Sequence, residues 1–150
     1  MAPGVSDSTG SLTESDQAKI RRQIAGIQRK FPQVILQVVM RSLPAAHPFS
    51  LYAFWLFNAG AFAGQSQRGK NNRVILLVVD PTRKESALMP GYALESLLPP
   101  EALDHLLDLA SPAFEDGSWV QGIENVLSGL GKLLATIAVP QSALSAGQEY

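Results

Sequence analysis

Two short runs of apolar, mostly β-branched residues limit the folds open to this chain more than any other feature. They are QVILQVVMR, residues 33–41, and RVILLVVD, residues 73–80. A strand with one face in water alternates apolar and polar residues, whereas a nearly continuous apolar run is typical of a strand covered on both faces. Helices therefore have to lie above and below the sheet that holds these strands. The runs predict an α/β protein.

The segments around these strands carry helical patterns. Residues 12–31 begin with a capping-box pattern, Thr13 and Asp16, and then repeat apolar residues at helical spacing. Residues 49–64 are rich in aromatic side chains, which suits a helix packed on a sheet. Residues 119–138 have the best helical periodicity in the chain. The alternation of helices with buried strands indicates helical layers on both sides of one sheet.

The remaining elements complete one domain. Residues 85–89 are predicted to form a strand antiparallel to the one before, after a turn that contains Pro81. The segment from Pro90 to Ala110 holds short helical pieces interrupted by consecutive prolines. We therefore predict a single-domain, Rossmann-like α/β/α sandwich with a small mixed sheet of three to four strands. We expect the chain to consist of a loosely ordered segment over residues 1–11, the domain over residues 12–139, and a polar tail over residues 140–150.

Charge and composition exclude several classes of function. The net charge of −1 provides no electrostatic footprint for nucleic acid, so we expect no nucleic-acid partner. The absence of cysteine excludes disulfides and thiolate chemistry. No apolar stretch is long enough to span a membrane, and no signal peptide is visible. We expect a soluble monomer, periplasmic or lumenal if a leader was removed and otherwise cytoplasmic.

Three local patterns have ordinary structural interpretations. GQSQRGKN, residues 64–71, matches a phosphate-binding loop except for Asn71, but a helix precedes it and a strand follows, which is the reverse of the order that such a loop requires. We interpret it as a polar connection. Glu101, His105 and Asp108 share a helical face, which we interpret as solvated rather than metal-binding. We interpret the aromatic residues of segment 49–64 as core.

Several segments in the same order resemble the TPM domain family. They are NNRVILLV, TRK, GYALE, LPP and SPAFEDGSWVQGI, preceded by VSDSTGSLTESD and LYAFWLFNA. The family includes a thylakoid-lumen phosphatase-like protein, a photosystem II repair factor and a nematode receptor accessory protein. The resemblance implies a compact α/β/α sandwich, which agrees with the element order above. It also implies an acidic cleft that holds a divalent cation, Ca²⁺ or Mg²⁺, and acid-phosphatase activity has been proposed for some members.

The matching positions define candidate site residues. Asp7 is the acid of the opening motif, Asp80 and Arg83 belong to the turn after the second apolar strand, and Glu95 is the acid of GYALE. Asp7, Asp80 and Glu95 are the candidate metal ligands, because hard cations take several carboxylate oxygens from different segments. Asp80 and Arg83 are the candidate catalytic residues, and Arg83 or the adjacent lysine would hold the phosphate.

The chain departs from the family pattern at positions that matter for catalysis. The second glycine of the GxGLE motif is Ala93, and the aspartate of the LTD motif is replaced by Pro100. Fewer acids therefore converge. Two hypotheses remain open: a non-catalytic accessory module that binds an unknown protein of a membrane-associated complex, and a weak metal-dependent phosphatase acting on phosphomonoesters.

Overall fold

The computed structural model of the chain describes residues 4–43, 48–59 and 73–148. Its elements, in chain order, are β1 (Val5–Asp7), α1 (Glu14–Lys30), β2 (Ile35–Met40), α2 (Phe49–Ala59), β3 (Val74–Asp80), β4 (Glu85–Pro90), a 3-10 turn η1 (Tyr92–Leu94), α3 (Pro100–Glu115) and α4 (Trp119–Gln148). The pattern GQSQRGKN, residues 64–71, lies outside the described residues.

The four strands form one mixed sheet in the order β1-β2-β3-β4. β1, β2 and β3 are parallel, so their carboxyl ends share one edge of the sheet. β4 runs antiparallel to β3 and forms the outer strand. The prediction of a small mixed sheet is confirmed, as is the antiparallel hairpin.

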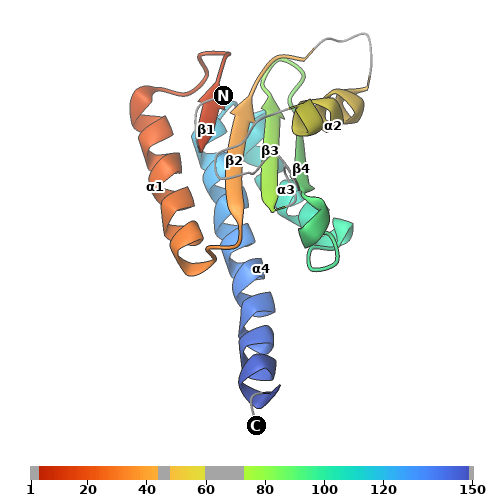
Figure 1. Ribbon diagram of the computed structural model, residues 1–150. Coiled ribbons are helices and arrows are strands. Elements are labelled where there is room, and N and C mark those ends of the chain that lie inside the picture. The colour runs from red at the N-terminus through yellow and green to blue at the C-terminus, as the bar shows by residue number, and fades with distance from the viewer. Residues whose placement is uncertain (1–3, 44–47, 60–72, 149–150) are drawn as a thin grey trace.

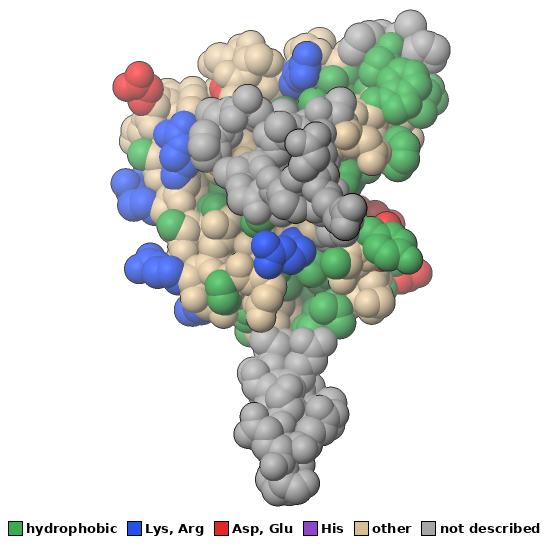
Figure 2. All heavy atoms as spheres, viewed as in Figure 1, with side chains coloured by type: hydrophobic (Ala, Val, Ile, Leu, Met, Phe, Trp, Pro, Cys, Tyr) green, Lys and Arg blue, Asp and Glu red, His purple; other side chains and the backbone are tan. Residues whose placement is uncertain are grey.

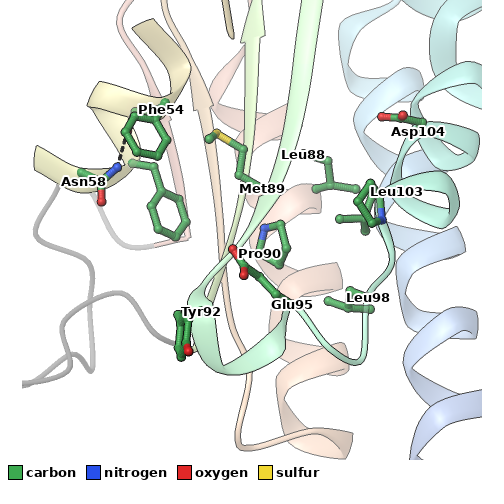
Figure 3. A pocket seen from close by; sticks show the side chains of 12 residues that line it. Phe54, Asn58, Leu88, Met89, Pro90, Tyr92, Glu95, Leu98, Leu103 and Asp104 are labelled. Carbon is green, nitrogen blue, oxygen red and sulfur yellow. Dashed lines mark hydrogen bonds between the residues drawn. The ribbon is translucent and has the colours of Figure 1, made fainter. Parts of the chain in front are cut away.

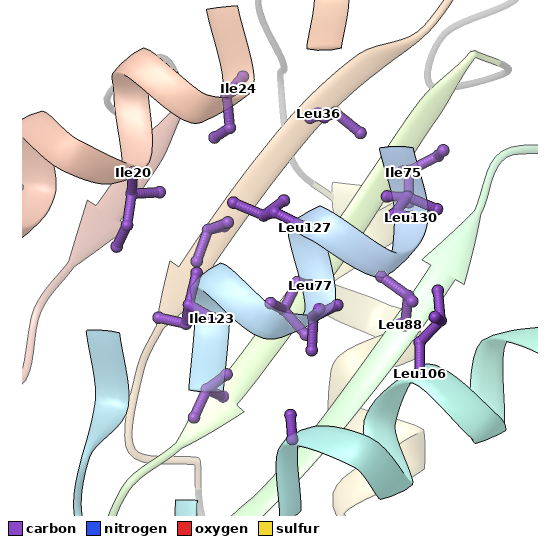
Figure 4. Packing of buried hydrophobic residues seen from close by; sticks show 14 of the residues in the cluster. Ile20, Ile24, Leu36, Ile75, Leu77, Leu88, Leu106, Ile123, Leu127 and Leu130 are labelled. Atoms are coloured by element: carbon purple, nitrogen blue, oxygen red, sulfur yellow. The ribbon is translucent and has the colours of Figure 1, made fainter. Parts of the chain in front are cut away.

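Helices cover both faces of the sheet, as Figure 1 shows. α1, α3 and α4 pack on one face, where apolar side chains from all three helices meet the strands (Figure 4). α2 packs on the other face, against residues of β2 and β3 such as Val39 and Leu76. β3 is buried along its whole length. Side chains along a strand alternate between faces, so a strand between two helical layers must be apolar at nearly every position.

Local patterns in α1 agree with the structure. The Thr13 hydroxyl accepts the Asp16 N–H at 3.0 Å, and the Asp16 carboxylate accepts the Thr13 N–H at 3.1 Å. This reciprocal capping box confirms the predicted start of the helix. Ile20 and Ile24 of this helix are buried in the core between α1 and the sheet.

Three expectations need correction. Val5–Asp7 forms strand β1, so the segment expected to be loosely ordered over residues 1–11 contributes part of the sheet. A strand of three residues is too short to show a period, and its pairing with β2 holds it. α4 continues to Gln148, beyond the expected end at residue 139, and Figure 1 shows it running past the sheet. Phe54 and Trp55 are 54% and 48% exposed, so the core interpretation holds only for part of the aromatic segment.

In the part of the chain that the structure describes, no helix is both long enough and apolar enough to cross a membrane.

Candidate functional site

The carboxyl edge of the parallel strands is the place where folds of this kind gather their functional groups. Two predicted site residues end strands there, Asp7 on β1 and Asp80 on β3. β2 lies between these strands and ends at Met40. The structure therefore brings two of the three candidate metal ligands to one edge of the sheet.

The Asp7 carboxylate holds the loop between β1 and α1. One oxygen, Oδ1, accepts the Thr9 N–H at 2.8 Å and the Thr9 hydroxyl at 2.6 Å. The other, Oδ2, accepts the Leu12 N–H at 2.8 Å. These bonds form a compact aspartate turn that directs the chain from the strand into the helix.

The hydrogen bonds also set the ionisation of Asp7. Burial raises the pKa of this carboxyl. Hydrogen bonds from the Thr9 hydroxyl and from the N–H groups of Leu12, Thr9 and Gly10 together lower the pKa by more than burial raises it, so the pKa lies below its ordinary value of 3.8. Hydrogen bonds that stabilise the carboxylate are the physical cause of the lowered pKa. Asp7 is therefore an anion at neutral pH.

The lowered pKa predicts a pH-dependent contribution to stability. Because the folded-state pKa lies below the unfolded-state value of about 3.9, Asp7 stabilises the fold fully above that value and loses this effect as the pH falls through the folded-state pKa. We expect Asp7→Asn to destabilise the protein by about 1 kcal/mol at neutral pH and much less at about pH 2. Urea unfolding at both pH values measures the difference; an equal loss at both would contradict the assignment.

Asp80 has the same kind of role at the end of β3, in a fully buried position. Its side chain has 0% of its surface exposed. Oδ1 accepts the N–H groups of Thr82 and Arg83 at 2.9 and 3.1 Å, and Oδ2 accepts the Leu43 N–H at 2.9 Å. The carboxylate thereby ties the segment after β2 to the turn after β3.

Glu95 lies at the opposite edge of the sheet, away from the other two acids. β4 runs back along β3, so that Glu85 is paired with Asp80 whereas Pro90 is paired with Ile75 near the start of β3. Glu95 follows β4 after the turn η1. The prediction that Asp7, Asp80 and Glu95 converge on one cation is therefore corrected.

The donor set does not fit the divalent cation that the family resemblance implied. Among the described residues, no group of three acidic, His or Cys side chains could hold a metal ion. Calcium takes six to eight oxygen ligands, roughly, and magnesium requires nearly octahedral geometry. Asp80 is also buried among backbone N–H groups, and rotating it toward an ion would leave them without an acceptor.

The predicted phosphate ligands are engaged elsewhere. Arg83 Nε lies 3.3 Å from Glu85 Oε2, and the guanidinium lies over the Phe49 ring, 5.7 Å from its centroid. Lys84 Nζ donates to the Glu115 carbonyl at 3.0 Å. That carbonyl is at the C-terminal end of α3, where a cation is favoured by the helix dipole.

A polar hollow of about 540 Å³ lies at the carboxyl edge instead. It is lined by Ser8, Thr9, Ser11, Arg41, Ser42, Pro81, Thr82 and Trp119. Arg41 is exposed, and its guanidinium makes no hydrogen bond or ion pair with the other described residues. The sequence prediction missed this lining. The available signal was that polar residues follow β1 and β2 directly, and that Thr82 comes two residues after the end of β3.

The described lining of this hollow offers groups that can bind a ligand. Hydroxyl groups and a guanidinium can hold a polar or anionic group. Among the described residues that line it, none is a His, Asp or Glu that could act as a general base. The nearby carboxylates of Asp7 and Asp80 already accept hydrogen bonds from the loops that they order.

Comparison with known proteins identifies a protein family that matches most of the chain. The model of the TPM domain family matches residues 5–133. No curated protein matches the sequence.

Solved structures share the fold at low sequence identity. The N-terminal domain of a protein from P. gingivalis is similar with a TM-score of 0.68 and 22% identity, covering 87% of this chain and 80% of that chain. The N-terminal domain of the cg2496 protein from Corynebacterium glutamicum has a TM-score of 0.62 and 18% identity, covering 87% and 78%. The BA42 protein from the psychrophilic bacterium Bizionia argentinensis has a TM-score of 0.68 and 14% identity, covering 87% and 86%.

Proposed function

Because the chain belongs to the TPM domain family, we propose that it is a non-catalytic binding module that assists the assembly, repair or regulation of a membrane-associated protein complex. The family resemblance suggests this kind of role, and the site geometry favours it over hydrolysis. The observation that carries the proposal is the use of Asp7 and Asp80 as acceptors for backbone N–H groups.

A phosphatase would need groups that this edge does not bring together. Metal-assisted hydrolysis requires an ion that polarises the phosphoryl group or lowers the pKa of a bound water. Glu95 is at the other edge of the sheet, and both predicted phosphate ligands contact other groups. The alternative is a weak metal-dependent phosphatase, in which Arg41 would take the place of Arg83 or Lys84 as the phosphate ligand, since Arg41 lines the polar hollow.

A cation titration separates the two functions. For the binding module, we expect saturating Ca²⁺ or Mg²⁺ to leave the melting temperature unchanged. A cation that bound the native state would stabilise it by about 2.7 kcal/mol at a concentration of 100 Kd, which corresponds to roughly 5–10 °C in a domain of this size. The amide NMR spectrum of the protein, recorded with and without cation, shows whether residues 7 and 80 respond.

The activity measurement completes the test. We expect the rate of p-nitrophenyl phosphate hydrolysis, with either cation present, to equal the rate of the buffer blank. Turnover by the wild type that is lost in Arg41→Ala, accompanied by a cation-dependent rise in melting temperature, would establish the phosphatase instead. Lys30→Ala, which removes an exposed charge at the end of α1, is the control variant.

A further inference from the structure

β4 is an edge strand whose outer side carries backbone groups without a partner in the sheet. Within the part of the chain that the structure describes, it pairs with β3 alone, at the end of the strand order. In an antiparallel pair, alternate residues direct both their N–H and their C=O toward the neighbouring strand. The other residues direct these groups outward, where another chain can pair with them.

The register identifies which groups of β4 point outward. The Gly91 N–H donates to the Val74 carbonyl at 2.7 Å, so the hydrogen-bonded positions in β4 are Met89, Ala87 and Glu85. The N–H and C=O groups of Ser86 and Leu88 therefore face the open edge. Pro90 is also one of the residues whose backbone groups face outward, so the N–H that proline lacks would not have bonded to β3.

An apolar groove of about 670 Å³ lies across this edge. Figure 3 shows that its walls come from both helical layers, with Phe54 and Asn58 of α2 on one side of β4 and Leu103 and Asp104 of α3 on the other. Leu88, Met89 and Pro90 of β4 form the part between them. Phe54 and Tyr92 are 54% and 80% exposed, which is unusual for large aromatic side chains outside a binding surface. In the view of Figure 2, hydrophobic side chains gather over α2 and beside β4.

The charged residues that line the groove are acidic. Glu95 and Asp104 line it, and no hydrogen bond or ion pair of either carboxylate is recorded with the described residues. α3 adds two more exposed acids, Glu101 and Asp108, and its sequence contains no Lys or Arg. The groove is therefore complementary to a partner with apolar and basic side chains. Two copies paired through β4 would instead bring their acidic α3 faces together, which is unfavourable.

We propose that the β4 edge binds an extended peptide segment of a partner protein as an additional strand. The segment pairs with the backbone of Ser86 and Leu88, places apolar side chains in the groove, and presents Lys or Arg to the acids of α3. Addition of a strand to a sheet edge uses main-chain hydrogen bonds for affinity and side-chain pockets for specificity. The inference rests on the proposed accessory function and supplies the chemistry of its partner.

The test selects peptides from a display library of random segments of about eight residues on the full-length chain. We expect enrichment of peptides that combine β-branched residues with Lys or Arg. Titration calorimetry then compares one enriched peptide on the wild type, Ser86→Ala and Ser86→Pro. Ser86→Ala keeps the outward N–H and should bind as the wild type does. Ser86→Pro removes it and places a ring on the edge, and should bind at least about tenfold more weakly.

A double variant tests the contribution of the acidic side chains of α3. We expect Asp104→Asn with Asp108→Asn to weaken binding severalfold and to reduce its salt dependence. Glu14→Gln, on the helix beside β1, should change neither. Amide spectra and melting temperatures confirm that each variant is folded.

Three results would overturn the inference: no enrichment of peptides, equal binding to the folded Ser86→Pro variant, or dimers of the free chain that Ser86→Pro dissociates. Each of them leaves the non-catalytic function standing, since that function fails on phosphatase turnover and cation binding instead.

Discussion

Replacing Asp80 with alanine is expected to destabilise this protein by about 3–4 kcal/mol, the largest effect of a single substitution that we predict. The substitution leaves the N–H groups of Leu43, Thr82 and Arg83 without their acceptor. Each buried donor without a partner costs about 1–3 kcal/mol, and partial relaxation of the turn offsets some of that loss. At about 2–4 °C per kcal/mol for a domain of this size, the melting temperature should fall by roughly 10 °C.

Thermal and urea unfolding followed by circular dichroism measure this effect. Asp80→Asn should recover little of the stability that Asp80→Ala loses, because the NH₂ group of asparagine must face an N–H donor on one side of the turn. Asp104→Ala, which removes an exposed carboxylate from α3, should change stability by no more than about 0.5 kcal/mol. A loss below about 1 kcal/mol for Asp80→Ala would show that the carboxylate does not hold the two turns together.

Two glycines of α4 should respond to the same substitution with opposite signs. A Cβ at Gly122 would overlap the Phe114 ring of α3, which is itself stacked on Trp119 with the centroids 5.9 Å apart. A Cβ at Gly131 would meet Ile27 of α1 at 3.6 Å, an ordinary contact. Alanine has a higher helix propensity than glycine by up to about 1 kcal/mol. The space around each glycine therefore decides whether alanine stabilises the helix at that position.

We therefore expect Gly122→Ala to destabilise the protein by about 2 kcal/mol, because forcing a ring aside in a packed interface costs about 1–3 kcal/mol. Gly131→Ala should stabilise it by roughly 0.5–1 kcal/mol. Urea unfolding of both variants beside the wild type provides the comparison. Stabilisation by Gly122→Ala would mean that α3 and α4 are less closely packed than the structure indicates.

The sequence was sufficient for the elements with a strong local pattern. The continuous apolar runs predicted β2 and β3, since a strand between two helical layers needs an apolar side chain at nearly every position. The capping box predicted the start of α1. β1 escaped prediction because its three residues carry no period, although Val5 is completely buried.

The candidate site was predicted only in part. Asp80 was expected at the end of a strand, whereas Asp7 was expected in a loosely ordered segment and ends β1 instead. The role of both as loop acceptors depends on N–H groups whose positions the sequence pattern does not specify. The misplacement of Glu95 was avoidable. The predicted antiparallel hairpin already requires the chain after β4 to lie at the edge opposite Asp80.

By itself, the sequence determined the fold class and the family, because the alternation of apolar and polar residues is set by which face of each element is buried. Only the tertiary structure decided which loops share an edge, that β4 stands at the end of the sheet with Ser86 and Leu88 facing outward, and that Gly122 approaches Phe114 too closely for a side chain. Those features depend on strand order, strand direction and the distance between packed helices. They arise between residues far apart in the chain, where a local pattern contains no information.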